Sequence, residues 1–276
     1  MMRAILAALA VLALSACSQG VEHGGGAPRR IVSLDYCADQ YVLKFADRQD
    51  ILALSPDAEK RFSYMRAAAA GIPTVRPRTA DVLALKPDLV VRSYGGGQDI
   101  AGFLNELGVS VVQVGSPQTI AEVRAEVLRV GTELGKPERA KALAEDMDQR
   151  LAALANREGL HRTVLYMTAG GVTAGEGTLV HELLLAAGLE NFQDRPGWNP
   201  LPLERLAYER PDLIAAAFFE EKTSQVDSWS AARHPVARAQ LRELPVVSLE
   251  GSWTSCGGWF LLDAVEALAK SGEGMR

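Results

Sequence analysis

The stretch from Pro137 to Asn156 constrains the fold more than any other part of this sequence. Its apolar residues recur every three or four positions, which places them on one face of a helix. They are Ala140, Leu143, Ala144, Met147, Leu151, Leu154 and Ala155. Pro137 suits the first turn of a helix, and Gly159 lies just beyond its end. A helix of this length spans roughly 30 Å, so it either covers a sheet or connects two domains.

The segments before and after this helix resemble each other, which favours the connecting role. Three features recur in the same order. They are a basic residue with a short apolar run (30–34 and 162–166), a helical pattern that ends at Pro-Asp before a buried strand (82–90 and 206–214), and a further strand (109–114 and 245–249). We therefore predict an α/β fold of two Rossmann-like lobes, at 29–135 and 160–276, bridged by one long helix at 136–159. A cleft between two lobes is a usual place for a ligand.

Composition narrows the function. With 276 residues and 48% hydrophobic content, the chain can bury one large core or two modest ones. The net charge is −5 and there is no basic tract, which argues against nucleic-acid binding. The sequence contains no P-loop, no H-E-x-x-H or G-x-S-x-G signature and no spaced Cys/His zinc motif. We therefore predict a binding protein rather than an enzyme, with no metal site and no intrinsic cofactor.

The N-terminus carries an export pattern. Arg3 is followed by an apolar run at 4–14, too short for a usual membrane span, and then by small residues. We predict a signal peptide at 1–16. The sequence Leu-Ser-Ala-Cys that ends at Cys17 resembles the bacterial lipobox, which would make Cys17 the lipidated first residue. The alternative is an ordinary signal peptide with an incidental cysteine. Residues 17–28 are glycine-rich and predict a flexible tether.

In the first lobe, several loops that are expected at one end of the sheet carry aromatic or cationic side chains. Tyr36 lies at the strand-to-helix turn after 31–34, and Tyr94 lies in a glycine-rich loop after 89–91. Three arginines occupy such loops: Arg76, Arg78 and Arg92. The carboxyl ends of parallel strands face the ligand crevice of open α/β folds, so we expect these side chains at the cleft. Guanidinium groups there would suit a carboxylate, a phosphate or a charged chelate; the alternative is that the arginines are solvated surface residues.

Loops of the second lobe present tryptophans. Trp198 lies in a loop that prolines make rigid, at 195–202. Trp253 and Trp259 lie in a short glycine-containing segment after the strand at 246–249, although aromatic residues are only 6% of the chain. Core packing accounts for some aromatic residues of this segment. We expect Trp253 to face the cleft, and we count Trp198 and Trp259 with it as candidate ligand contacts because aromatic rings give large contact areas.

The sequence resembles the periplasmic iron-chelate and vitamin B12 receptors that feed ABC importers. The resemblance runs from about Arg29 to Lys270 and lies in the order of its motifs, which are Arg-Ile-Val-Ser-Leu at 30–34, Leu-Ala-Leu-Lys-Pro-Asp-Leu-Val at 83–90 and Pro-Asp-Leu-Ile at 211–214. It implies two α/β lobes joined by a single long helix, a monomer, and delivery of a ferric siderophore or a corrinoid to a permease.

Individual residues follow from the same resemblance. Trp198 matches a corrin-contacting tryptophan, and Trp253 falls on a ligand-contacting loop. Glu204 matches the acidic residue that docks the permease. In the first lobe Ala80 occupies the aligned position, and the adjacent Asp81 is taken as the counterpart. A first-lobe cleft tryptophan of the B12 receptors is missing, which makes an anionic ferric siderophore an equal candidate. Other candidates are a receptor for another small anion or metal ion and an exported enzyme. The resemblance and the export pattern together predict a location in the periplasm or cell envelope, and the lipobox predicts attachment to the membrane through Cys17.

Cys37 and Cys256 remain once Cys17 is set aside, and both lie on loops expected to face the cleft from opposite lobes. In an oxidising compartment they would form a disulfide if their Cα atoms lay within about 7 Å of each other. Two free thiols and a soft ligand pair for a metal centre are the alternatives.

Overall fold

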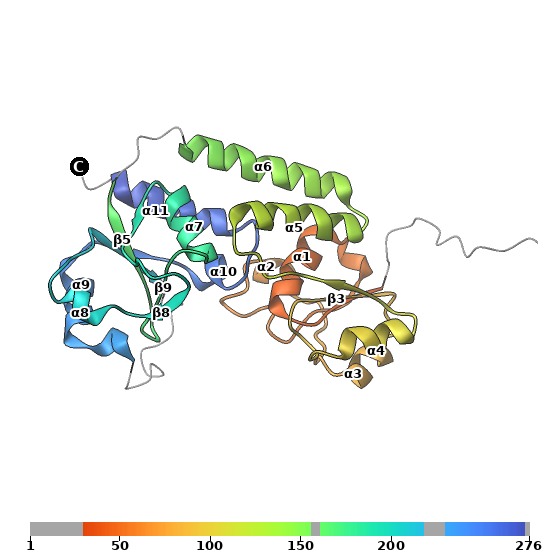
Figure 1. Cartoon of the computed structure of the whole chain (residues 1–276). Coiled ribbons are helices and arrows are strands. Elements are labelled where there is room, and N and C mark those ends of the chain that lie inside the picture. Colours follow the sequence, from red (N-terminus) through yellow and green to blue (C-terminus); the bar gives the residue numbers. More distant parts are fainter. Residues whose placement is uncertain (1–29, 156–160, 218–229, 274–276) are drawn as a thin grey trace, which may run out of the picture.

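The long helix α6 (Pro137–Ala155) lies along one side of the molecule and passes over both lobes (Figure 1). The computed structural model describes residues 30–155, 161–217 and 230–273. Five residues of the predicted apolar stripe are buried, Leu151 is half-buried, and Ala155 is exposed where the helix ends. Ion pairs hold α6 at both ends. Lys136, just before the helix, lies 2.7 Å from Asp47 of the first lobe, and Arg150 lies 2.6 Å from Asp263 of the second.

The first lobe contains a parallel sheet of four strands in the order β2-β1-β3-β4. The strands are β1 (Ile31–Ser33), β2 (Ile51–Ala53), β3 (Leu89–Arg92) and β4 (Ser110–Gln113). The helices are α1 (Tyr36–Phe45), α2 (Arg66–Ala69), α3 (Thr79–Ala84), α4 (Ile100–Glu106) and α5 (Ile120–Glu133), with a 3₁₀ turn at Arg48–Asp50.

The second lobe repeats this topology. Its main sheet is also parallel, in the order β10-β9-β5-β7, so the first strand of each lobe lies between the second and the third. The strands are β5 (Thr163–Thr168), β7 (Glu190–Asn191), β9 (Leu213–Ala217) and β10 (Val246–Ser248), with an antiparallel pair of β6 (Val172–Ala174) and β8 (Trp198–Pro200). The helices are α7 (Leu179–Ala186), α8 (Leu203–Leu206), α9 (Pro235–Glu243), α10 (Gly251–Thr254) and α11 (Leu261–Glu273), with a 3₁₀ turn at Ala231–Arg233.

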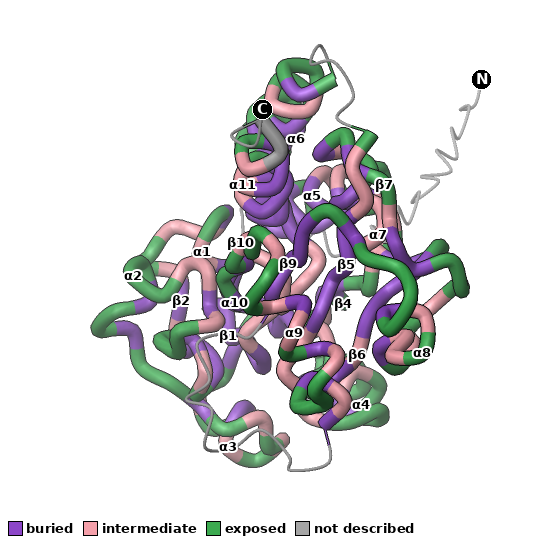
Figure 2. Tube along the Cα trace, turned by 90° about the vertical axis from the view of Figure 1, so that its left-hand side faces the viewer, coloured by how far each residue is buried: buried purple, intermediate pink, exposed green. Residues whose placement is uncertain are grey.

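This arrangement confirms the predicted fold of two α/β lobes with a bridging helix, while the residue limits of the lobes stay predictions. The central strands of the two sheets (β1, β3, β5 and β9) and the inner face of α6 are largely buried (Figure 2), whereas β4, β7 and β10 are partly exposed. The predicted signal peptide, Cys17 and the tether lie outside the described residues. Within those residues, the structure contains no helix with the length and apolar character needed to span a membrane.

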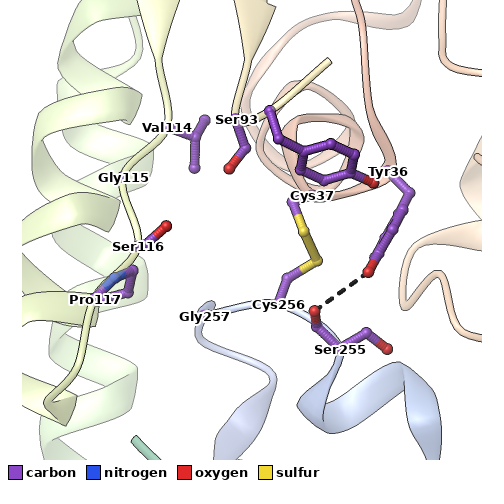
Figure 3. Close-up of a pocket in the computed structure, with 11 residues that line it drawn as sticks. Tyr36, Cys37, Ser93, Val114, Gly115, Ser116, Pro117, Ser255, Cys256 and Gly257 are labelled. Carbon is purple, nitrogen blue, oxygen red and sulfur yellow. Dashed lines mark hydrogen bonds between the residues drawn. A yellow bond between two sulfur atoms is a disulfide. The ribbon is translucent and has the colours of Figure 1, made fainter. Parts of the chain in front are cut away.

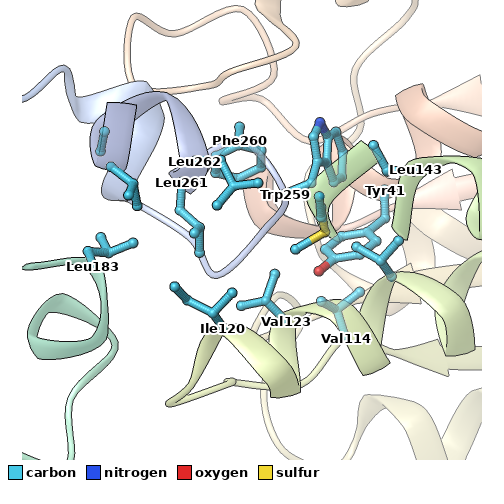
Figure 4. Close-up of a cluster of buried hydrophobic side chains, with 14 of the residues drawn as sticks. Tyr41, Val114, Ile120, Val123, Leu143, Leu183, Trp259, Phe260, Leu261 and Leu262 are labelled. Atoms are coloured by element: carbon cyan, nitrogen blue, oxygen red, sulfur yellow. The ribbon is translucent and has the colours of Figure 1, made fainter. Parts of the chain in front are cut away.

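The largest hydrophobic core crosses from one lobe to the other (Figure 4). Trp259 and Phe260, which precede α11 in the second lobe, pack into the first. The Trp259 ring centroid lies 5.6 Å from that of Tyr41 on α1, and Phe260 stacks on Tyr64 at 4.8 Å. The lobes therefore share part of one core, and α6 is not their only connection.

Candidate functional site

A cavity of about 330 Å³ lies between the lobes, and both supply its walls (Figure 3). The first lobe contributes Tyr36 and Cys37 at the start of α1, Ser93 and Tyr94 after β3, and residues 114–117 after β4. The second lobe contributes residues 255–257, between α10 and α11. The cavity thus forms where three parallel strands of the first lobe end, as expected for an open α/β sheet.

Tyr36 and Tyr94 form an aromatic wall of this cavity. Their ring centroids lie 5.9 Å apart with an edge-to-face tilt, and the ring centroid of Phe62 lies 4.7 Å from that of Tyr36. Burial, followed by the charge of Asp35, raises the pKa of the Tyr36 phenol. Burial and the neighbouring Tyr36 likewise raise the pKa of Tyr94. Both phenols are therefore neutral at physiological pH and available as hydrogen-bond donors.

The floor of the cavity is a disulfide between Cys37 and Cys256, whose Cα atoms lie 5.6 Å apart. The two alternatives considered above, free thiols and a pair of metal ligands, are therefore not adopted. Among the described residues, no group of three or more His, Cys, Asp or Glu side chains is arranged to hold a metal ion.

Hydrogen bonds flank the disulfide and cross between the lobes. The Tyr36 hydroxyl donates to the carbonyl oxygen of Ser255 (3.4 Å), and the Tyr41 hydroxyl donates to that of Gly257 (3.1 Å). A Cβ atom on Gly257 would lie 2.5 Å from Cγ of Pro117, so only glycine allows the second lobe to approach the segment after β4 this closely.

The structure does not bring the three candidate arginines to the cavity. Arg76 is exposed and lies 3.4 Å from Asp81, and Arg78 is exposed immediately before α3. Arg92 is buried at the end of β3, and its Nε has no hydrogen-bond partner. The alternation of side chains along β3 places Arg92 on the same face as Val90, which packs in the core beside α3 and α4, while Val91 faces the other core. The three arginines therefore do not converge on this cavity, contrary to the expectation from the sequence.

The three candidate tryptophans have different surroundings. Trp198 is 58% exposed on β8, with its ring 6.2 Å from that of buried Tyr166. Trp253 is half-buried on α10 and packs against the main core, so it lies on a short helix and not on a loop. Trp259 is only 4% exposed and is a core residue, which corrects its assignment as a ligand contact. None of the three is among the described residues that line the cavity.

The two candidate docking acids are both in the first turn of a short helix. Glu204 is exposed on α8, and Asp81 lies on α3. Both helices lie on the side of the molecule away from α6 (Figure 1).

Sequence reasoning missed several residues of the site, namely Ser93, residues 114–117, Ser255 and Gly257. Those at 114–117 follow β4 directly, so the rule applied to the first and third strands would have included them. The contribution of Ser255 and Gly257 carried no such signal, because it depends on how the second lobe packs against the first.

The sequence matches the family model described as periplasmic binding protein over residues 68–228, more than half of the chain. The chain belongs to the periplasmic binding protein family. This membership confirms the prediction of a binding protein rather than an enzyme, and it agrees with the predicted extracytoplasmic location. Lipid attachment through Cys17 stays a prediction.

Several characterised proteins are similar in sequence. A vitamin B12-binding protein of Salmonella typhimurium is 27% identical over 62% of this chain and 64% of its own length. A cobalamin-binding protein of Halobacterium salinarum is 24% identical over 76% of this chain and 60% of its own length. The chain thus spans less than two thirds of these relatives. A vitamin B12-binding protein of Yersinia pseudotuberculosis is 27% identical over 88% of this chain and 86% of its own length.

Solved structures share the fold. A periplasmic heme binding protein from Pseudomonas aeruginosa matches with a TM-score of 0.68 and 22% identity, over 90% of this chain and 94% of that one. A periplasmic vitamin B12 binding protein of Vibrio cholerae matches with a TM-score of 0.64 and 20% identity, over 89% of this chain and 97% of that one.

Proposed function

We propose that this protein is the extracytoplasmic receptor of an ABC importer, which captures a metal chelate between its lobes and delivers it to the permease. The observation that carries the proposal is the cavity to which both lobes contribute, with the rings of Tyr36 and Tyr94 on one wall and the Cys37–Cys256 disulfide as its floor. A cavity between two domains that offers aromatic rings and a few polar groups is typical of a small-molecule site. The names of the sequence relatives support a chelate as the ligand.

The lining of the cavity favours a corrinoid over an anionic ferric siderophore. Among the described residues that line it, none is charged, and the polar groups are hydroxyls and backbone atoms. The amide side arms of a corrinoid are neutral and bond well to such groups, whereas an anionic siderophore needs cationic partners. Arg76, Arg78 and Arg92 do not supply them. We therefore place a corrinoid first and a ferric siderophore or haem second.

A volume of about 330 Å³ lies at the small end of the range for ligand sites. A corrinoid would bury only part of its surface in the cavity, and the remainder would lie against the cleft outside it. Exposed aromatic rings suit that outer contact because they offer large apolar areas at little entropic cost. Trp198 is our candidate for this role.

Delivery requires contact with the permease and the membrane. Glu204 on α8 and Asp81 on α3 are our proposed docking acids, because both are in helices on the side away from α6. Cys17 is our proposed lipid attachment site.

The test measures binding of cyanocobalamin, hemin and a ferric siderophore to the purified protein. Absorption spectra and tryptophan emission report the binding. We expect cyanocobalamin to bind and to quench the emission, and Tyr94→Ala to weaken its binding by at least tenfold. Tyr208→Ala is the matched control, since Tyr208 is 92% exposed and does not line the cavity. Binding of hemin or the siderophore alone would refute the corrinoid assignment. Absence of binding by all three would refute a chelate receptor and favour a small anion, a metal ion or an exported enzyme.

A further inference from the structure

Asp35 is a buried carboxylate that no part of the proposed binding mechanism uses directly. It lies between β1 and α1, is 3% exposed, and does not line the cavity. Its Oδ1 accepts a hydrogen bond from the backbone N–H of Ala38 (3.0 Å) and so caps the N-terminus of α1. Helix capping is a common structural role, and by itself it would explain why an aspartate occupies this position.

The second oxygen of Asp35 makes contacts that a cap does not require. Its Oδ2 accepts hydrogen bonds from three consecutive backbone N–H groups in the loop after β3. The donors are Ser93 (2.7 Å), Tyr94 (3.1 Å) and Gly95 (2.9 Å). Several N–H donors compensate a buried carboxylate for the loss of water. In return, the single oxygen fixes the path of a loop that lies nearly 60 residues away in sequence.

The loop packs tightly at the same place. A Cβ atom on Gly95 would lie 2.4 Å from the carbonyl oxygen of Leu34, so this part of the loop rests directly on the residue before Asp35. Only glycine permits this approach. The ring of Tyr94 then lies on the cavity side, edge-to-face with Tyr36, the residue that follows Asp35.

We infer that Asp35 is a positioning residue for the cavity: through one buried carboxylate it sets the backbone of both aromatic residues that form the wall. Tyr36 is held because Asp35 caps the helix on which it stands. Tyr94 is held because Asp35 accepts from its own N–H and from those of both its neighbours. The effect on ligand binding rests on the proposed function, whereas the effect on the loop does not.

A separation-of-function variant distinguishes this role from capping alone. Serine is a good helix cap, but its shorter side chain has one oxygen. That oxygen can accept from the N-terminus of α1 but not also from the N–H groups of the loop at 93–95. Asp35→Ser is therefore expected to retain the start of α1 and to release the loop at 93–95. Asp35→Asn preserves the size of the side chain and loses the charge, and it serves if the serine variant fails to fold.

Asp39 provides a matched control. It is also a fully buried carboxylate near the start of α1, but it accepts from the N–H (3.0 Å) and the hydroxyl (2.6 Å) of Ser55 and does not line the cavity. Asp39→Asn removes the same charge four residues along and leaves the loop at 93–95 with its acceptor.

The experiment combines amide hydrogen exchange with cyanocobalamin binding on the purified protein. For Asp35→Ser we expect exchange at 93–95 to rise at least tenfold, exchange within α1 to change less than threefold, and cyanocobalamin affinity to fall at least tenfold. Asp39→Asn should leave exchange at 93–95 and the affinity within twofold of the unmodified protein.

Faster exchange of α1 with an unchanged loop would show that Asp35 is only a helix cap and overturn the inference. A released loop with unchanged affinity would overturn it as well. If the unmodified protein binds no chelate, the proposed function fails, and exchange at 93–95 together with the ring contact of Tyr94 in fluorotyrosine NMR spectra still decides the inference.

Discussion

Cys37 and Cys256 form a disulfide between the two lobes with their Cα atoms 5.6 Å apart, although 219 residues separate them in sequence. The bond closes one side of the cavity. Next to it, Tyr41 of the first lobe bonds to Gly257 of the second, and Trp259 packs against Tyr41. The side of the cleft that carries these contacts is therefore fixed, and any opening of the lobes must pivot about it.

Removal of the disulfide should destabilise the protein strongly. For a closed loop of about 220 residues, the chain-entropy model gives a stabilisation of about 5 kcal/mol, and native disulfides typically contribute about 2–5 kcal/mol. We expect Cys37→Ala/Cys256→Ala to lose that much unfolding free energy in urea titrations. A Cys17→Ala chain, unfolded without reductant, should show no free thiol and should show two after reduction. Two free thiols before reduction would contradict the bond.

The ion pairs between α6 and α11 should contribute more unfolding free energy than a similar but more exposed ion pair. Arg150 donates to both Asp263 (2.6 Å) and Glu266 (2.7 Å), and Asp263 also accepts from the Tyr64 hydroxyl of the first lobe. Arg150→Met leaves the half-buried Asp263 without its cationic partner and is expected to cost about 2 kcal/mol of unfolding free energy.

The control is Arg124→Met, which removes a two-bond pair with Asp148 that is more exposed. Such exposed pairs contribute about 0–1 kcal/mol, so this variant should remain close to the unmodified protein. Equal losses for the two variants in urea titrations would contradict a special role for the α6–α11 contact.

Asp39 should make stability depend on pH. Burial raises its pKa from 3.8 to about 6, against the opposing effect of hydrogen bonds from Ser33 and Ser55. Because the folded state binds the proton more tightly than the unfolded state, this contribution to stability is greatest below pH 4 and is lost as the pH rises to about 6. Asp39→Asn resembles the protonated acid. As the pH rises from 4 to 7, the unfolding free energy of this variant should increase relative to that of the unmodified protein by up to about 3 kcal/mol. Parallel pH profiles of unfolding free energy would show that Asp39 does not titrate in this range.

Glu204 should affect transport without affecting binding. Glu204→Arg reverses the charge of an exposed residue on α8 that does not line the cavity. We expect chelate affinity within twofold of the unmodified protein and at least a tenfold fall in uptake by cells that carry the importer. Glu138→Arg, on the opposite side in the first turn of α6, is the control and should leave both unchanged. Normal uptake by the Glu204 variant would refute the docking role.

Local signals in the sequence, together with the family resemblance, predicted the fold. The alternation of short apolar runs, Pro-Asp turns and helical patterns is repeated in the two halves, and the structure shows the same strand order in both sheets. The long helix was predicted because its apolar residues lie on one face over about five turns. Its bridging role was predicted from the likeness of the segments before and after it. Such patterns are readable because they depend on residues close together in the chain.

The arrangement of the site was decided by tertiary packing. Trp253 and Trp259 lie six residues apart in one segment, yet Trp259 is buried in the shared core and Trp253 is half-buried on α10. Arg92 ends a strand that points to the cleft, but it is buried, and side-chain alternation places it on the same face as Val90. The pairing of Cys37 with Cys256 and the contact of Asp35 with the loop after β3 join residues far apart in sequence. These contacts form only when the sheets and lobes pack together, and no pattern of neighbouring residues in the sequence specifies which distant residues will meet.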